Sequence, residues 1–297
     1  NNFGIGDKLD PKKTGDVVVV GGNATFPSGK VYYGNLIAGG SVAGVGAPVV
    51  NGMEKGTYVK GEITTLPVEF AAEQEYLKEL SANIAKLPST GTYTFQYGIY
   101  TVKGDCSSKV QVFNVSAAEL ATTNTLYNSC IPAGATVIFN ILGDTATLKN
   151  MGMQSLTAFL EKVLFNFPTA TSVNMTSVGI EGSVLAPYAQ FYNPSGSING
   201  RLIAKSWLSN NYGWVGINNI KFTGDLSAAV LAGTKNAAAI HRYQLGKTAF
   251  AGFDVLKQAF VLKQQQIPSA SNSFEQLLLS SLLYVSPDAI SPKASRV

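Results

Sequence analysis

Residues with catalytic or metal-binding chemistry are few and widely spaced in this 297-residue sequence. The only histidine is His241, in the stretch AAAIHRYQLG, and no serine or cysteine motif of a catalytic triad lies beside it. One histidine and two separated cysteines do not form a zinc-binding pattern. We therefore expect no catalytic residue and no metal site.

Acidic residues are also too scattered for the usual chemistry of polysaccharide cleavage. Such enzymes need clustered carboxylates, whereas Asp105, Asp144 and Glu181 are isolated at predicted bends. The other acids of interest fall in a predicted helix, where we expect them to form its solvated face: Glu69, Glu73, Glu75 and Glu79. The sequence thus predicts a protein that is not an enzyme.

Cysteines and glycosylation sequons together indicate secretion. Cys106 and Cys130 flank a predicted strand, and Asn-x-Ser/Thr sequons occur at Asn23, Asn114 and Asn174. The first residues, NNFGIGDKLD, are those expected of a mature chain after removal of a signal peptide. We expect a Cys106–Cys130 disulfide, which would contribute about 3 kcal/mol. The alternative is two free buried thiols and sequons that occur by chance.

Composition and charge restrict the class of protein further. The chain is 45% hydrophobic and only 13% charged, which describes a folded chain. Its formal charge of +4 is spread without a dense Lys/Arg block, so a nucleic-acid partner is not expected. No apolar run approaches the roughly 18 residues of a membrane span. We expect an extracellular or cell-surface protein without a transmembrane segment.

Short apolar phrases recur at fixed intervals along the chain. VVVVGGN (17–23) and NLIAGGS (35–41) are eighteen residues apart, as are GSVLA (182–186) and GRLIA (200–204). VFNV, IFNI and LFNF begin at 112, 138 and 164, twenty-six residues apart. The glycine pairs at 21 and 39 lack a phosphate-loop or dinucleotide pattern, so we expect turns there and no cofactor. Repeats of this kind predict a β-solenoid, in which Gly182 and Gly200 occupy equivalent bends of adjacent coils.

Three asparagines share the twenty-six-residue period. Asn114, Asn140 and Asn166 are expected to stack as an amide ladder or to serve in turns. A buried ladder is incompatible with a glycan on Asn114, and we favour the ladder or turn role there. Asn23 and Asn174 are the stronger glycosylation candidates.

Two segments have helical periodicity. Residues 67–87 begin with Pro67 and stop before Pro88, and we expect this helix to lie along the flank of the solenoid. Its apolar residues form one stripe: Phe70, Tyr76, Leu77, Leu80, Ile84 and Leu87. Residues 153–162 predict a further turn or two of helix.

The ordered phrases resemble a known family. GDVVVVGGNATF, GNLIAGGSV, PVEFAAEQEYLKELSANIAKLP, IPAGATVIFNI and INGRLIA are together similar to the choice-of-anchor A family of secreted, adhesive surface domains, over roughly residues 3–226. GSVLA followed by INGRLIA also resembles the solenoid domain of microbial ice-binding proteins, which carries a long helix beside its coils. The resemblance implies a mainly β fold, a β-solenoid with a long flanking α-helix, and an adhesive role.

The last part of the chain departs from that family, because no stalk repeat or anchor follows. We divide the chain into a solenoid domain, 1–226, and a C-terminal extension, 227–297, with helical spacing of apolar residues. The extension is expected either to cap its own solenoid or to dock on a neighbouring subunit. The candidate self-assembly residues are Phe250, Phe253, Phe260, Phe274, Leu277, Leu278 and Leu282.

These features together predict a secreted, non-catalytic structural or adhesive protein. Its expected partners are further copies of itself and extracellular matrix or surface polymers. The alternative is an ice-binding protein that uses a flat face with Thr-x-Thr pairs at 123/125, 145/147 and 169/171. Those pairs are 22 and 24 residues apart, not 26, so they do not share the period of the strand phrases.

Overall fold

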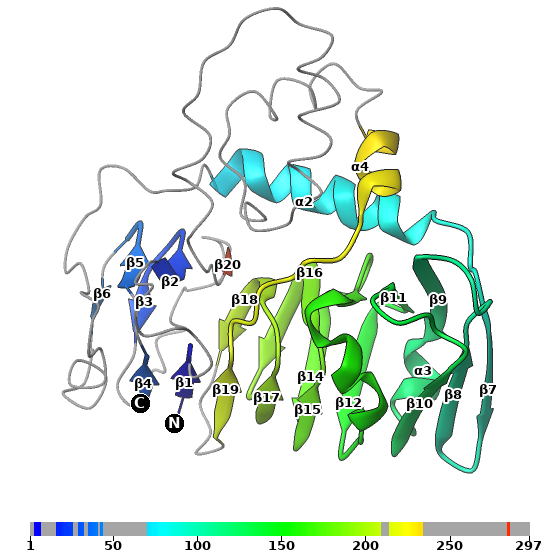
Figure 1. Cartoon of the computed structure of the whole chain (residues 1–297). Coiled ribbons are helices and arrows are strands. Elements are labelled where there is room, and N and C mark those ends of the chain that lie inside the picture. Colours follow the sequence, from blue (N-terminus) through cyan, green and yellow to red (C-terminus); the bar gives the residue numbers. More distant parts are fainter. Residues whose placement is uncertain are drawn as a thin grey trace, which may run out of the picture.

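The chain folds into a mainly β structure whose largest sheet is parallel and curled (Figure 1). The computed structural model describes residues 3–6, 16–25, 29–32, 35–40, 42–43, 70–208, 214–233 and 284–285. Between these residues every strand pairing is parallel except that of β7 with β8. His241 and the seven apolar candidates for self-assembly lie outside the described residues.

The first series of strands forms the long sheet beneath the main helix in Figure 1. In spatial order its members are β9 (Val110–Ser116), β11 (Thr136–Leu142), β13 (Val163–Asn166), β16 (Ser183–Tyr192), β18 (Leu202–Leu208), β20 (Tyr284–Val285), β2 (Asp16–Val20) and β5 (Asn35–Ala38). The spatial order follows the sequence order from β9 to β20 and breaks between β20 and β2, so that β20 lies between β18 and the N-terminal strand β2.

Two further series complete the β structure. The second comprises β12 (Thr145–Lys149), β14 (Ser172–Thr176) and the C-terminal halves of β16 and β18, with a separate pair β3 (Ala24–Thr25) and β6 (Val42–Ala43). The third comprises β15 (Val178–Ile180), β17 (Gly196–Ile198), β19 (Val215–Ile217), β1 (Phe3–Ile5) and β4 (Lys30–Val31). A small sheet is formed by β7 (Thr92–Gln96), β8 (Ile99–Lys103) and β10 (Thr125–Ser129).

The repeated phrases lie side by side in the predicted register. Asn114 pairs with Asn140 and Asn140 with Asn166, which confirms the twenty-six-residue series. Leu185 pairs with Ile203, and Val19 with Ile37, which confirms both eighteen-residue intervals. An ideal Cβ on Gly200 would lie only 2.3 Å from the carbonyl oxygen of Gly182, so the two glycines are stacked at equivalent bends, as predicted.

Apolar residues on the inner side of the three series form one continuous core. Its centre is a row of aromatic rings from successive strands, with centroids of Phe113 and Phe139 5.6 Å apart and those of Phe139 and Phe165 5.0 Å apart. Parallel pairing in register places identical residues in contact, and offset aromatic stacking stabilises that contact. The phenylalanine of each repeated phrase therefore has the same role in its strand.

The predicted long helix is α2 (Phe70–Ala85), which covers the outer side of the first series. Its apolar stripe packs on outward-facing strand residues such as Ile138, Leu164 and Leu185, as expected. The helix α4 (Ser227–Gly233) packs against the same cluster through Ala229 and Val230.

The prediction that the acids of this helix face solvent is wrong for Glu73, which is only 4% exposed. Glu73 follows Phe70 by three residues and precedes Leu77 by four, so it lies on the buried stripe itself. The expected short helix at 153–162 is a 3-10 helix, η1 (Gln154–Lys162), and α3 (Ala117–Leu120) is one additional turn that begins at the N-cap Ser116.

The described parts of the C-terminal extension, α4 and β20, both pack on the rest of the chain. The helical spacing predicted for the extension does not hold at Tyr284 and Val285, which form a strand. The two flanking strands offer their unpaired edges to these residues, so tertiary hydrogen bonding overrides the local helical pattern. Within the described residues, no helix has the length and apolar character needed to cross a membrane.

Candidate functional site

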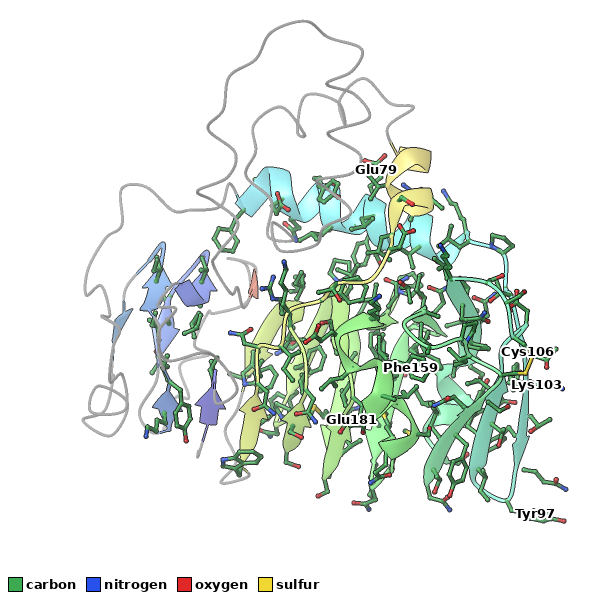
Figure 2. The ribbon with its side chains drawn as sticks, viewed as in Figure 1. Glu79, Tyr97, Lys103, Cys106, Phe159 and Glu181 are labelled. Carbon is green, nitrogen blue, oxygen red and sulfur yellow. A yellow bond between two sulfur atoms is a disulfide. The ribbon has the colours of Figure 1, made fainter. Side chains whose placement is uncertain are left out.

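The two cysteines are joined, as predicted. Cys106 and Cys130 form a disulfide with a Cα–Cα distance of 4.5 Å. Beside it the backbone N–H of Cys106 donates to the carbonyl of Cys130, and that of Gly104 donates to Ser129. Figure 2 shows Cys106 and Lys103 at the same end of the stack, where the bond fastens the β8–β9 connection to the end of β10. The role of the disulfide is to hold the last strands at this end of the molecule together.

The asparagine ladder is present and lies between the first series and α2. Asn140 Nδ2 donates to Asn114 Oδ1 at 3.1 Å, and Asn166 Nδ2 donates to Asn140 Oδ1 at 2.9 Å. The helix completes the network, because Asn140 and Asn166 also donate to the carbonyls of Ile84 and Ser81. The Ser81 hydroxyl donates to Asn166 Oδ1 at 2.6 Å. The ladder therefore attaches α2 to the sheet and has a structural role.

The three sequons lie in different surroundings. Asn114 is half-buried at the end of the ladder, whereas Asn174 and Asn23 are exposed. The Asn174 side chain projects from β14 and the Asn23 side chain from the turn after β2. The geometry thus agrees with the preference for Asn23 and Asn174 over Asn114 as glycan acceptors, and glycosylation itself stays a prediction.

The isolated acids do not converge on one site. Asp105 follows β8, Asp144 follows β11 and Glu181 follows β15. The Ser108 hydroxyl and backbone N–H, with the Gln111 amide, donate to Asp105 and hold the pKa of its carboxyl well below its usual range. Across the described part of the chain, no group of three potential metal ligands comes together.

A second polar ladder was not predicted. Asn199 Nδ2 donates to Glu181 Oε1 at 2.8 Å, and Asn218 Nδ2 donates to Asn199 Oδ1. These residues directly follow β15, β17 and β19, which are stacked in register. The sequence contains a sign of this ladder, because Glu181 and Asn199 immediately precede the repeated glycines Gly182 and Gly200.

The outer side of the second series carries rows of polar side chains. One row runs across three strands through Thr145, Ser172 and Gln190, which are paired in register. The next row lies two residues further along each strand and contains Thr147, Asn174, Tyr192 and Leu208. We call these seven residues the polar face.

The polar face is supported by an apolar layer directly beneath it. The residues that alternate with it point inward and are buried, among them Ala146, Leu148, Val173 and Phe191. The Phe191 ring stacks on Trp207 of the next strand with centroids 5.7 Å apart. Alternation of this kind, repeated on adjacent strands, places one set of side chains in the core and the other on the surface.

The chemistry of the polar face is that of neutral hydrogen bonding combined with aromatic contact. It contains hydroxyl and amide groups but no charged residue, and the Lys149 side chain lies at the end of β12 beyond it. Tyr192 is 47% exposed and Leu208 is also exposed, so the row has apolar surface available for contact. Such a surface can bind an extended neutral ligand through several weak contacts at once.

The Thr-x-Thr pairs of the ice-binding alternative do not form an array on this face. Only Thr145 and Thr147 belong to it, and Thr123 is buried. Thr171 donates to the Asp144 carbonyl and the Thr169 hydroxyl donates to the Gly143 carbonyl, so the pair at 169/171 lies beside residues 143 and 144 and not beside 145 and 147. The threonine pairs are 22 and 24 residues apart and not 26, and as expected they do not lie in one row across the strands.

A comparison with protein-family models identifies the family of this chain. Residues 1–214 match the family model described as "Putative Ice-binding-like adhesive domain". The chain is a member of this family. No curated protein and no solved structure matches the chain. The match names the ice-binding-like adhesive family and not the choice-of-anchor A family, so the resemblance seen in the sequence holds at the level of an adhesive, ice-binding-like domain.

Within this ice-binding-like adhesive domain, sequence reasoning found the disulfide and the asparagine ladder but missed the polar face. Alternation of polar and apolar residues is visible in TATLK (145–149) and SVNMT (172–176). These strands share no repeated phrase, so their alignment with β16 was not visible without the structure. The β-bulge between Ala186 and Gln190 shifts the register there and conceals it further.

Proposed function

We propose that the protein is a non-catalytic adhesive domain that binds an uncharged polysaccharide of a cell surface or extracellular matrix through the polar face. The observation that carries this proposal is the in-register array of Thr145, Thr147, Ser172, Asn174, Gln190 and Tyr192, none of which is charged. Because a glycan on Asn174 would cover this array, the proposal requires Asn174 to be unglycosylated and leaves Asn23 as the glycosylation candidate. Membership of an adhesive family supports it.

The chemistry of such a polymer is complementary to the polar face. Sugar hydroxyls both donate and accept hydrogen bonds, as do the threonine hydroxyls and the asparagine and glutamine amides. Tyr192 offers an aromatic ring against which the apolar side of a sugar ring packs. Adjacent strands are about 4.8 Å apart, so a repeating chain laid across them meets equivalent groups at regular intervals.

We also propose that the three stacked series are the coils of a β-solenoid of the choice-of-anchor A type. Parallel pairing at intervals of eighteen and twenty-six residues supports this winding. The disulfide and the adhesive family support an extracellular location. The separate positions of Asp105, Asp144 and Glu181 support a role without catalysis.

For the C-terminal extension we propose an intramolecular cap at α4 and β20, and we retain the seven apolar residues between them as candidates for self-assembly. The pairing of β20 with β18 and β2 supports the cap. Deletion of residues 246–297 separates the two roles. Loss of self-association with a folded remainder indicates assembly, and unfolding of a chain that was always monomeric indicates a cap.

Retention on insoluble polysaccharide tests the adhesive proposal. The full chain is incubated with cellulose and with chitin particles, and the bound fraction is measured for wild type, Tyr192→Ala and Tyr127→Ala. Tyr127 is similarly exposed, at 52%, but belongs to β10 outside the polar face, so it is the matched control. We expect wild type and Tyr127→Ala to be retained and Tyr192→Ala to be weakened. Absence of wild-type retention on both polymers, or equal loss in both variants, contradicts the proposal.

The ice-binding alternative depends on the same polar face and on the family description. It requires a regular threonine array, which the register does not provide. Thermal hysteresis of the purified chain distinguishes the two functions, and we expect none.

A further inference from the structure

The strand β7 is an open edge at one end of the molecule. Among the described residues it is the outermost strand of the sheet β10–β8–β7 and pairs only with β8 (Figure 1, far right). Its five residues, Thr92–Gln96, carry no charge and no proline. Edge strands are usually protected by lysine, proline or a bulge, and β7 has none of these devices.

The strand β9, the last strand of the first series at the same end of the molecule, has a covered edge at Val112. The Thr90 N–H donates to the Val112 carbonyl of β9, and the Val112 N–H donates to the Thr90 hydroxyl at 2.8 Å. The segment just before β7 thus satisfies the outward-directed backbone groups of Val112 in β9. The described residues provide no equivalent cover for β7.

The turn determines which backbone groups of β7 point outward. Tyr97 and Gly98 both have positive φ, 53° and 75°, and form the two-residue loop between β7 and β8. In such a hairpin the flanking residues, Gln96 and Ile99, form a hydrogen-bonded pair, and bonded pairs alternate along the strands. Tyr93 and Phe95 therefore direct their N–H and C=O groups away from β8.

The side chains of these two residues lie on the inner side of the sheet, at the end of the core. Tyr93 stacks on the buried Tyr100 with centroids 4.8 Å apart, and Phe95 lies 5.8 Å from the same ring. Tyr93 is nevertheless 44% exposed, because no further strand follows β7. The edge thus combines unpaired backbone groups with an uncovered aromatic surface.

We propose that β7 pairs with β7 of a second copy of this chain, antiparallel, about a twofold axis at Thr94. In this register Tyr93 lies opposite the partner's Phe95, and Phe95 opposite the partner's Tyr93. Both outward-directed residues then form hydrogen-bonded pairs, which gives four backbone hydrogen bonds. The uncharged strand places no like charges across the axis, and the exposed Tyr93 ring is covered.

This self-association goes beyond the adhesive function and does not depend on it. It uses the sheet edge at β7, whereas the polar face belongs to β12, β14, β16 and β18. A twofold dimer would carry two polar faces, and two sites on one particle increase the retention on a polymer without any new contact.

A single engineered cysteine tests the geometry. The chain has only Cys106 and Cys130, which are bonded to each other, so Thr94→Cys adds the one free thiol. Thr94 faces its copy in a non-hydrogen-bonded pair, for which the Cα–Cα distance of about 4.5 Å suits a disulfide. Thr101→Cys on the adjacent β8 is the control, because it pairs with Thr94 but lies one strand further from the axis. Under mild oxidation we expect Thr94→Cys to form covalent dimers at least about tenfold faster than Thr101→Cys.

A charge substitution tests the association without a cross-link. Sedimentation over a concentration series is expected to show a monomer–dimer equilibrium for wild type. Thr94→Lys places two like charges directly opposite, and we expect its dissociation constant to rise at least about tenfold. Thr101→Lys keeps the charges about three strand spacings apart, beyond the Debye length of roughly 8 Å, and is expected to dimerise like wild type. A wild-type chain that stays monomeric throughout, a dimer unaffected by Thr94→Lys, or equal cross-linking of both cysteine variants overturns the proposal.

Discussion

Asn140 is the central residue of the amide ladder, because it bonds to both other asparagines and to the helix α2. It is fully buried and takes part in three hydrogen bonds: Nδ2 donates to Ile84 O at 3.3 Å and to Asn114 Oδ1 at 3.1 Å, and Oδ1 accepts from Asn166 Nδ2 at 2.9 Å. Asn140→Ala removes all three. Asn166 Nδ2 keeps its bond to the Ser81 carbonyl, but the Ile84 carbonyl loses this side-chain donor in a water-excluded interface.

The expected loss follows from the number of bonds. A buried hydrogen bond contributes about 1 kcal/mol net, so three lost bonds lower the free energy of unfolding by about 3 kcal/mol. For a domain of this size that corresponds to a fall in the melting temperature of roughly 6 to 12 °C. Asn114→Ala is the matched control, because Asn114 is half-buried and provides one ladder bond, and we expect it to lose about 1 kcal/mol.

Urea unfolding of the full chain, followed by circular dichroism, measures both variants. The ladder account requires Asn140→Ala to be clearly more destabilised than Asn114→Ala. Equal and small losses in the two variants would show that the amide ladder does not hold the helix on the sheet.

Three further predictions concern the stability of the fold. Replacing Cys106 and Cys130 together by serine removes the link between adjacent strands. We expect the free energy of unfolding, measured in urea, to fall by about 3 kcal/mol and hydrogen exchange to become faster in β8 and β10. An unchanged free energy of unfolding would contradict this. Gly200→Ala places a methyl group 2.3 Å from the Gly182 carbonyl oxygen, so the melting temperature should fall by several degrees, whereas a wild-type value would refute the close stacking. Burial lowers the pKa of Arg201 to about 10, and its Nε and Nη1 have no hydrogen-bond partner among the described residues, so Arg201→Met should leave the free energy of unfolding unchanged or raise it. A clearly destabilised Arg201→Met would refute the argument.

The parts of the fold that were predictable are those in which equivalent residues repeat. Parallel strands in register place the same side chain at the same position of each strand, so the spacing of Asn114, Asn140 and Asn166 fixed their neighbours in advance. The disulfide followed from the positions of the two cysteines on either side of such a strand. The buried stripe of α2 followed from helical spacing, and the same spacing, applied to Glu73, would have predicted its burial.

The parts that were not predictable depend on contacts between segments with no shared pattern. Nothing local indicates that Tyr284 and Val285 pair with β18 and β2, because the partner edges are distant in sequence. The polar face required the alignment of β14 with the C-terminal half of β16, which follows a bulge. Both features arise from tertiary hydrogen bonding, which sequence periodicity does not report.

The adhesive function is tested most directly by locating the contact surface of a bound polysaccharide. Oxidative footprinting of the full chain reports the solvent access of individual tyrosines with and without a saturating hexasaccharide of whichever polymer, cellulose or chitin, retains the wild type. The polar-face account predicts protection of Tyr192 and no change at Tyr127, which lies on β10 and is equally open to solvent in the free protein. Unchanged oxidation of Tyr192, or protection of Tyr127 in its place, would contradict it.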